Sequence, residues 1–150
     1  MSTATASATP SSEADIRALI DSWIKSVHAQ DVAGIASHYA PDILAFDAIM
    51  QLQFKGREAY TKHWEACLAM CPGPGIFEMH DLRITAGEDV GFAHCLNRCG
   101  GTDESGEEKA SWMRMTAGYR KSNGKGTVVH EHWSAPFDME SGKALFDLKP

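Results

Sequence analysis

Hydrophobic residues at helical spacing dominate the start of the chain. Six of them recur at i, i+3, i+4, i+7, i+8 and i+11 and so share one stripe of a helix: Ile16, Leu19, Ile20, Trp23, Ile24 and Val27. Ser12, with Asp15 three residues later, resembles a capping box. The pattern therefore predicts a long helix over residues 12–30.

Two shorter helices are predicted next. Asp31 can cap a helix that Pro41 stops. Its apolar face would consist of Val32, Ile35, Ala36 and Tyr39. After a short strand over residues 43–47 and a loop, a third helix begins at Gly56, and the Pro-Gly-Pro-Gly sequence at 72–75 ends it. The apolar face of this helix is predicted to carry Tyr60, Trp64, Cys67 and Leu68.

The rest of the chain alternates strand-forming segments with turn residues. Segments rich in Val, Ile, Phe, Trp, Thr and Met cover 76–86, 89–100, 108–121 and 126–136, and Gly-rich turns separate them. This pattern predicts an antiparallel meander, and helices that precede a sheet are typical of an α+β fold.

Apolar groups on both faces of these strands suggest a further partner. Met113, Met115, Ala117 and Tyr119 alternate with Trp112 and Thr116. Because the helices can cover only one face of the sheet, we expect a second copy of the chain on the other face, and so a homodimer.

Composition and charge narrow the class of protein. With 150 residues the chain is predicted to form one domain over residues 12–136, after a disordered tail of small residues at 1–11 and before a less patterned extension at 137–150. A net charge of −6 without a basic cluster argues against nucleic-acid binding. Apolar runs of about four residues are too short for a membrane helix, which needs about 20. The N-terminus does not resemble a signal peptide, so we expect a cytoplasmic protein with reduced thiols.

Short sequences along the chain carry a family resemblance: Tyr39-Ala40-Pro41-Asp42, Phe46-Asp47, Gly56-Arg57-Glu58, Gly87-Glu88-Asp89, Tyr119-Arg120-Lys121 and Val129-His130-Glu131-His132-Trp133-Ser134. Together with the order of elements they resemble the NTF2-like superfamily, also known as SnoaL-like or cystatin-like. The resemblance covers roughly residues 12–136. It implies three helices packed on a curved, mainly antiparallel sheet, with a small-molecule pocket between them. The fold hosts isomerases, cyclases, dehydratases, hydrolases and binding modules.

One member of this superfamily, ketosteroid isomerase, moves a proton beside a carbonyl with a carboxylate, while a Tyr and a protonated Asp stabilise the enolate oxygen. The resemblance implies that Asp47 occupies the position of the base. It also implies ligand-facing positions at Trp23, Tyr39, Trp64, Asn97, Met115 and Trp133. Trp23 and Met115 replace the two oxyanion donors. Because a thioether donates no hydrogen bond and an indole is a weak donor, efficient steroid isomerisation is not expected.

Each candidate residue has a second interpretation. Asp47 is a general base or an ordinary strand-end residue that caps a turn. The aromatic residues line a ligand pocket or fill the core. Strand alternation puts Glu131 on one face with Val129 and Trp133, and His130 and His132 on the opposite face. Glu131 then faces the pocket as a proton donor, or it faces solvent or a partner.

The functional hypothesis is therefore an apolar pocket for a small organic molecule. In the catalytic version, an isomerase, lyase or cyclase without a cofactor uses Asp47 as base, and Trp23, Trp64 or Glu131 donates toward the developing oxygen. The alternative is a ligand-binding or dimerisation module without chemistry.

Histidines and cysteines do not indicate a metal site. His130 and His132 could share a metal with His94 or His80, but no spacing requires it. Cys95 and Cys99 are separated by about 13 Å along a strand, which is too far for one metal. We therefore expect that the chain binds no metal. The histidines are expected to be solvated or to lie at an interface, and the four thiols to be buried or half-buried.

Overall fold

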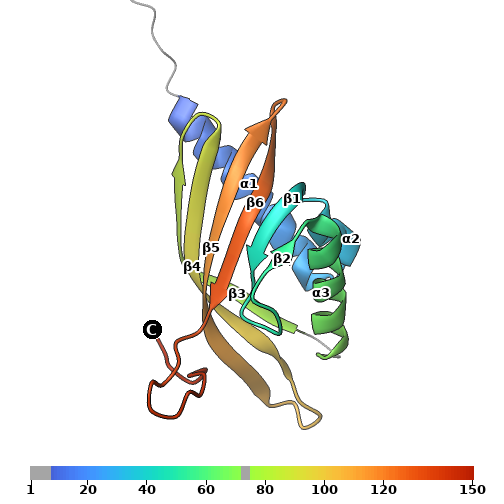
Figure 1. Cartoon of the computed structure of the whole chain (residues 1–150), viewed down its shortest axis with the longest axis vertical. Coiled ribbons are helices and arrows are strands. Elements are labelled where there is room, and N and C mark those ends of the chain that lie inside the picture. Colours follow the sequence, from blue (N-terminus) through green and yellow to red (C-terminus); the bar gives the residue numbers. More distant parts are fainter. Residues whose placement is uncertain (1–7, 72–74) are drawn as a thin grey trace, which may run out of the picture.

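The chain forms three helices and one six-stranded sheet in the computed structural model, which describes residues 8–71 and 75–150 (Figure 1). In chain order the elements are α1 (Ala8–His28), α2 (Val32–Ala36), β1 (Tyr39–Phe46), β2 (Phe54–Lys55), α3 (Arg57–Ala69), β3 (Gly75–Ala86), β4 (Val90–Thr102), β5 (Glu108–Ser122) and β6 (Lys125–Ser134). The strand order is β2-β1-β6-β5-β4-β3, with β1 parallel to β6 and the other neighbours antiparallel. The predicted α+β fold with a mainly antiparallel sheet is confirmed.

The helices cover one face of this sheet. Helix α1 contacts β3 and β6, and α3 contacts β1 and β2. In Figure 1, α1 passes behind the strands and α2 and α3 lie beside β1 and β2. The β5 residues Met113, Met115, Ala117 and Tyr119 are buried against this layer, whereas Thr116 is exposed on the other face. The predicted alternation along β5 is therefore confirmed, and the core lies between the helices and the inner face of the sheet.

Helix α1 begins at Ala8, four residues before the predicted start. Pro10 lies in its first turn, where the missing N–H of a proline breaks no hydrogen bond of the helix. The helix therefore extends into part of the predicted tail, and residues 1–7 lie outside the described residues.

The second helix is shorter than predicted. It ends at Ala36, and Tyr39 opens strand β1 and pairs with Val128 instead of lying on a helix face. Pro41 favours extended backbone at Ala40, the residue before it, and both Tyr39 and Ala40 belong to β1. The predicted strand over 43–47 is part of β1, and β2 lies at the end of the loop predicted after it.

A bulge changes the alternation along β6. Gly118 pairs with His130 and Tyr119 pairs with Val128, so Val129 is an extra residue in this strand. Val128 is buried and Val129 only half-buried. The prediction that Val129 shares the inner face with Glu131 is therefore wrong, because the bulge puts Val128 there.

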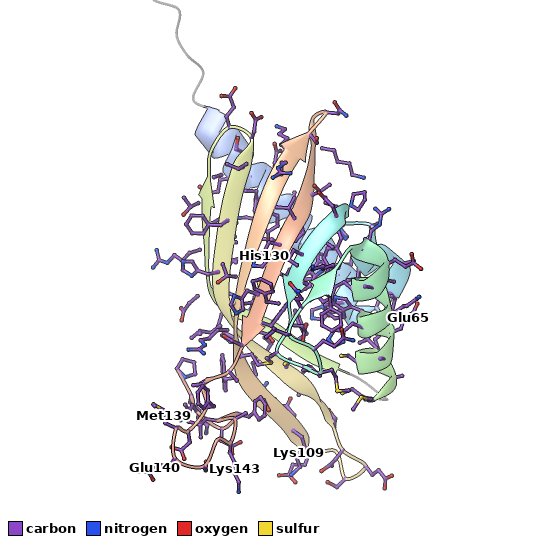
Figure 2. All side chains as sticks on the ribbon, viewed as in Figure 1. Glu65, Lys109, His130, Met139, Glu140 and Lys143 are labelled. Carbon is purple, nitrogen blue, oxygen red and sulfur yellow. The ribbon has the colours of Figure 1, made fainter. Side chains whose placement is uncertain are left out.

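The residues after β6 return along β5. The backbone N–H of Trp112 donates to the carbonyl oxygen of Phe146 at 3.3 Å, and Phe137 forms an isolated bridge with Ala144. Figure 2 shows Met139, Glu140 and Lys143 on the loop between Phe137 and Ala144. Among the residues described, no helix is both long and apolar enough to cross a membrane.

Gly100 marks a close approach of two backbones. A Cβ at this position would collide with the carbonyl oxygen of Lys109 and lie 2.7 Å from the Cα of Ala110 on β5. We expect Gly100→Ala to lower the free energy of unfolding by about 2 kcal/mol, because strand backbones cannot move apart cheaply. Gly118→Ala is the control, since its nearest heavy atom is the Cβ of His130 at 3.6 Å. Urea unfolding of both variants measures the difference, and equal stabilities would contradict this interpretation.

Candidate functional site

A cavity of about 370 Å³ opens between α1, α3 and the inner face of the sheet. Its wall is largely apolar and aromatic and includes Val27, Ile49, Trp64, Phe77, Met113 and Trp133. Asp47, His63 and Asn97 bring polar groups to the same wall. An apolar cleft of this size with a few polar groups is typical of small-molecule sites.

Asp47 reaches this cavity because of its place after β1. Ala45 is buried on the inner face, so strand alternation turns Phe46 outward and Asp47 inward. The Asp47 side chain is only 13% exposed. Its Oδ1 accepts a backbone hydrogen bond from Ile49 at 3.1 Å, and its Oδ2 accepts from the Tyr60 hydroxyl at 3.1 Å. These contacts hold the carboxylate in one orientation.

Helix α3 contributes the partners of Asp47. Tyr60 and His63 are three residues apart and therefore share a helix face. Nε2 of His63 lies 3.2 Å from Oδ1 of Asp47. The His63 imidazole packs on Phe54, with ring centroids 4.1 Å apart, and is nearly parallel to the Tyr60 ring. His63 therefore forms a buried dyad with Asp47.

Sequence reasoning missed both side-chain partners of Asp47, Tyr60 and His63. The predicted helix face counted hydrophobic residues, so it passed over His63 and treated Tyr60 as apolar. A polar residue three positions after Tyr60 was the available signal, because i and i+3 residues lie on the same face.

Glu131 lies on the inner face of β6, as one of the two interpretations predicted. Its register neighbours are Ala45 on β1 and Ala117 on β5, and these small residues leave room for its side chain. The residue is 3% exposed. Its Oε2 accepts from the Tyr60 hydroxyl at 2.9 Å and from Nε1 of Trp133 at 3.1 Å.

Burial raises the pKa of Glu131 to about 7. Hydrogen bonds from Trp133, Tyr60 and Tyr39 oppose this rise, and the charge of Asp47 adds to it. A substantial fraction of Glu131 is therefore neutral near pH 7. Its neutral carboxyl can donate a hydrogen bond as well as accept one.

The hydroxyl protons of this network have defined directions. Oη of Tyr39 accepts from Nε1 of Trp23 at 3.1 Å and from Nε1 of Trp64 at 3.0 Å. Both of its lone pairs are thereby used, so its own proton points to Glu131. Tyr60 has one proton between two carboxyl groups. When Glu131 is protonated it donates to Tyr60, and Tyr60 donates to Asp47.

Burial and the charge of Glu131 raise the pKa of Tyr39 and of Tyr60 well above 10, so both phenols stay neutral. A chain of hydrogen bonds therefore runs from the two indoles through Tyr39, Glu131 and Tyr60 to Asp47, and both tyrosine hydroxyls keep their protons.

The structure divides the predicted site residues into two layers. The wall of the large cavity holds Asp47, Trp64, Asn97 and Trp133. The layer behind it holds Trp23, Tyr39, Met115 and Glu131, where a space of only about 10 Å³ is left beside Trp23, Met115 and Glu131.

The indole donors do not have the position that sequence analysis expected. The N–H groups of Trp23 and Trp64 are both bonded to Tyr39, so neither is free to donate to a ligand oxygen. Trp64 instead offers its ring to the cavity.

The histidines of β6 lie away from the cavity. The His130 ring contacts Phe46, and its Nδ1 lies 2.6 Å from the carbonyl oxygen of Leu44. His132 is exposed. Residues 8–71 and 75–150 contain no group of three or more His, Cys, Asp or Glu side chains placed to hold a metal.

The cysteines are partly as expected. Cys95 is buried, and Cys67 and Cys99 are half-buried. The expectation is wrong for Cys71, which is exposed because it follows the end of α3.

Comparison with known proteins places this geometry in a family. The SnoaL-like domain family matches residues 16–138. The crystal structure of an NTF2-like protein of unknown function from Pseudomonas putida is 54% identical, with a TM-score of 0.89, and the match covers 95% of this chain and 99% of that one. No curated protein matches the chain.

Two more distant structures share the fold. A candidate dehydratase of the NTF2-like family from Streptomyces avermitilis is 12% identical, with a TM-score of 0.73 over 84% of this chain and 97% of that one. The association domain of C. elegans calcium/calmodulin-dependent protein kinase II is 15% identical, with a TM-score of 0.69 over 85% and 98%. The family match and the structure from P. putida show that this chain belongs to the SnoaL-like domain family and has the NTF2-like fold.

Proposed function

We propose that the chain binds a small organic molecule in the large cavity and moves a proton next to its carbonyl group, with Asp47 as general base. The observation that carries this proposal is the placement of Asp47 on the cavity wall, where His63, Tyr60 and the Ile49 N–H hold it. A carboxylate fixed at the edge of an apolar cleft is a suitable base for a carbon acid. The reaction needs no cofactor, because a base and an acid are sufficient for proton transfer.

The dyad with His63 favours elimination of water from a β-hydroxy ketone. Asp47 removes the proton from the carbon next to the carbonyl, and the electron pair of that C–H bond forms the new C=C bond. The C–O bond breaks, and the leaving hydroxide takes a proton from the His63 imidazolium. The proton on Asp47 then returns to His63 across the 3.2 Å contact, which restores both groups.

Glu131 acts in this proposal as a positioning residue. It lies behind the cavity wall, and in its neutral form it directs the Tyr60 proton to Asp47. The orientation of the base thus depends on a side chain that does not line the large cavity.

A second candidate is a binding module without chemistry. The observation in its favour is the position of the polar donors, because the indoles of Trp23 and Trp64 are bonded to Tyr39 and Glu131 does not line the large cavity. We therefore do not propose steroid isomerisation with an oxyanion hole like that of ketosteroid isomerase.

Replacement of the base tests the proposal directly. We expect the chain to accelerate exchange of α-protons with D₂O for at least one member of a panel of cyclic ketones and β-hydroxy ketones, followed by NMR. Asp47→Asn should slow this exchange at least about 100-fold, because an amide cannot take the proton. Asp42→Asn is the matched control, since Asp42 is an exposed residue of β1, the strand that Asp47 follows. A loss of only a few-fold, or no accelerated exchange with any ketone, would assign the cavity to binding alone.

The pH dependence of stability tests the environment of Glu131. Its pKa is raised from 4.5 to about 7 in the folded chain, so the unfolded chain ionises this group first. Stability from this group is therefore complete below about pH 4.5 and is lost as the pH rises to about 7. The loss amounts to about 3 kcal/mol. Glu131→Gln should remove it.

Urea unfolding between pH 4.5 and 7.5 measures this difference between the two proteins. Parallel stability curves for the original chain and the Glu131→Gln variant would show that Glu131 ionises as freely in the folded chain as in the unfolded one.

We also propose a homodimer through the outer face of the sheet. On β4, Val90 and Phe92 are 60% and 47% exposed, and on β5 the Trp112 ring contacts His80 of β3. Apolar surface of this kind is typical of protein interfaces. Light scattering should give a mass near twice the 16.3 kDa of one chain. Phe92→Arg should halve this mass, whereas the control Leu52→Arg, in an exposed loop, should leave it unchanged. A mass of one chain for the original protein would contradict the proposal.

A further inference from the structure

The side-chain oxygen of Asn97 is an acceptor without a partner. Asn97 lies on β4, is 0% exposed and lines the large cavity. Within the part of the chain that the structure describes, its Oδ1 is the one buried side-chain nitrogen or oxygen atom that makes no hydrogen bond. Buried polar groups in folded proteins nearly always have a partner, so an exception on a cavity wall requires an explanation.

The orientation of this amide is determined by its other end. Nδ2 of Asn97 donates to the backbone carbonyl oxygen of Glu78 at 3.1 Å. A carbonyl oxygen can only accept, so rotation of the amide would bring two acceptors into contact. The unpartnered atom is therefore the oxygen, and the group that is missing is a donor.

The neighbouring side chains cannot supply that donor. In the register of the sheet, Asn97 lies between Met79 on β3 and Met113 on β5. Thioethers have no N–H or O–H group. No donor of the described cavity wall reaches Oδ1 in the structure, so a ligand in the cavity is the natural source of the missing hydrogen bond.

The tryptophans of the wall present ring surface to the cavity. Nε1 of Trp133 is bonded to Glu131, and Nε1 of Trp64 is bonded to Tyr39. Their indoles thus provide flat apolar surface, while Asp47 and Asn97 provide acceptors. This combination suits a flat apolar molecule that carries a hydrogen-bond donor.

We propose that Asn97 is a specificity-determining residue that selects ligands with a neutral hydroxyl or N–H donor, which binds to its Oδ1. The inference rests on the proposed function only in taking this cavity as the ligand site. An ether or hydrocarbon of the same shape leaves Oδ1 unpartnered and is rejected. The selection is strong because a site built for a donor loses a buried hydrogen bond when the donor is absent.

A matched pair of probes tests this selection without knowledge of the natural ligand. 2-Naphthol and 2-methoxynaphthalene have the same flat ring system, but only the first has a donor. NMR titrations that follow the tryptophan indole N–H signals give both dissociation constants. We expect the original chain to bind 2-naphthol at least about tenfold more tightly than its methyl ether.

Two variants assign the preference to Asn97. Asn97→Leu, of similar size but without an acceptor, should bring the ratio of the two dissociation constants close to one. Thr116→Val, on the exposed outer face of β5 and away from the cavity, is the control and should keep the preference. Equal binding of the two probes by the original chain, a preference that survives Asn97→Leu, or no saturable binding of either probe would overturn the inference. The comparison with the original chain holds even if Asn97→Leu does not fold.

The two proposals fail in different ways, because these titrations do not depend on turnover. A chain that prefers 2-naphthol through Asn97 but exchanges no α-proton would overturn the proposed reaction and leave the role of Asn97 intact. A chain that exchanges protons through Asp47 but binds both probes equally would do the reverse.

Discussion

The carboxyl group of Glu131 is buried in the core, and its hydrogen-bond partners are the neutral donors Tyr60, Trp133 and Tyr39. Ionisation of a carboxyl group in such a place is costly, which is why the group retains its proton to a higher pH than usual. The single proton of the Tyr60 hydroxyl then has one direction open to it, toward Asp47. Tyr60 thus links the candidate base to a buried acid with a raised pKa, while the Ile49 N–H and His63 hold the other oxygen of Asp47.

The same network decides where the cavity can be. Because the indole N–H groups of Trp23 and Trp64 are bonded to Tyr39, the aromatic layer behind the wall is closed and has space of only about 10 Å³. The cavity of about 370 Å³ lies on the other side of Trp64 and Trp133, whose ring surfaces form part of its wall. One set of aromatic residues therefore contributes polar edges to the core and apolar surface to the cavity wall.

Local pattern predicted the fold well and the site only in part. The stripe from Ile16 to Val27 and the alternation along β5 were readable because each depends on residues close together in the chain. The second helix was predicted too long because Tyr39 pairs with Val128 on β6, a contact between distant residues that helical spacing does not reveal. The bulge at Val129 depends on the pairing of β5 with β6, which no pattern within one strand reveals.

The sequence by itself determined the order of three helices and the long strands, and with them a sheet covered on one face, because hydrophobic periodicity specifies which side of each element is buried. For Asp47, Asn97 and Glu131 the family resemblance, and not the periodicity, suggested inward-facing positions, and it left other interpretations open. The tertiary structure alone decided that Asp47 pairs with His63, that Glu131 lies behind the wall, and that Oδ1 of Asn97 has no partner. These properties depend on distances between side chains from different elements, and such distances exist only once helix α3, β1, β4 and β6 have packed together.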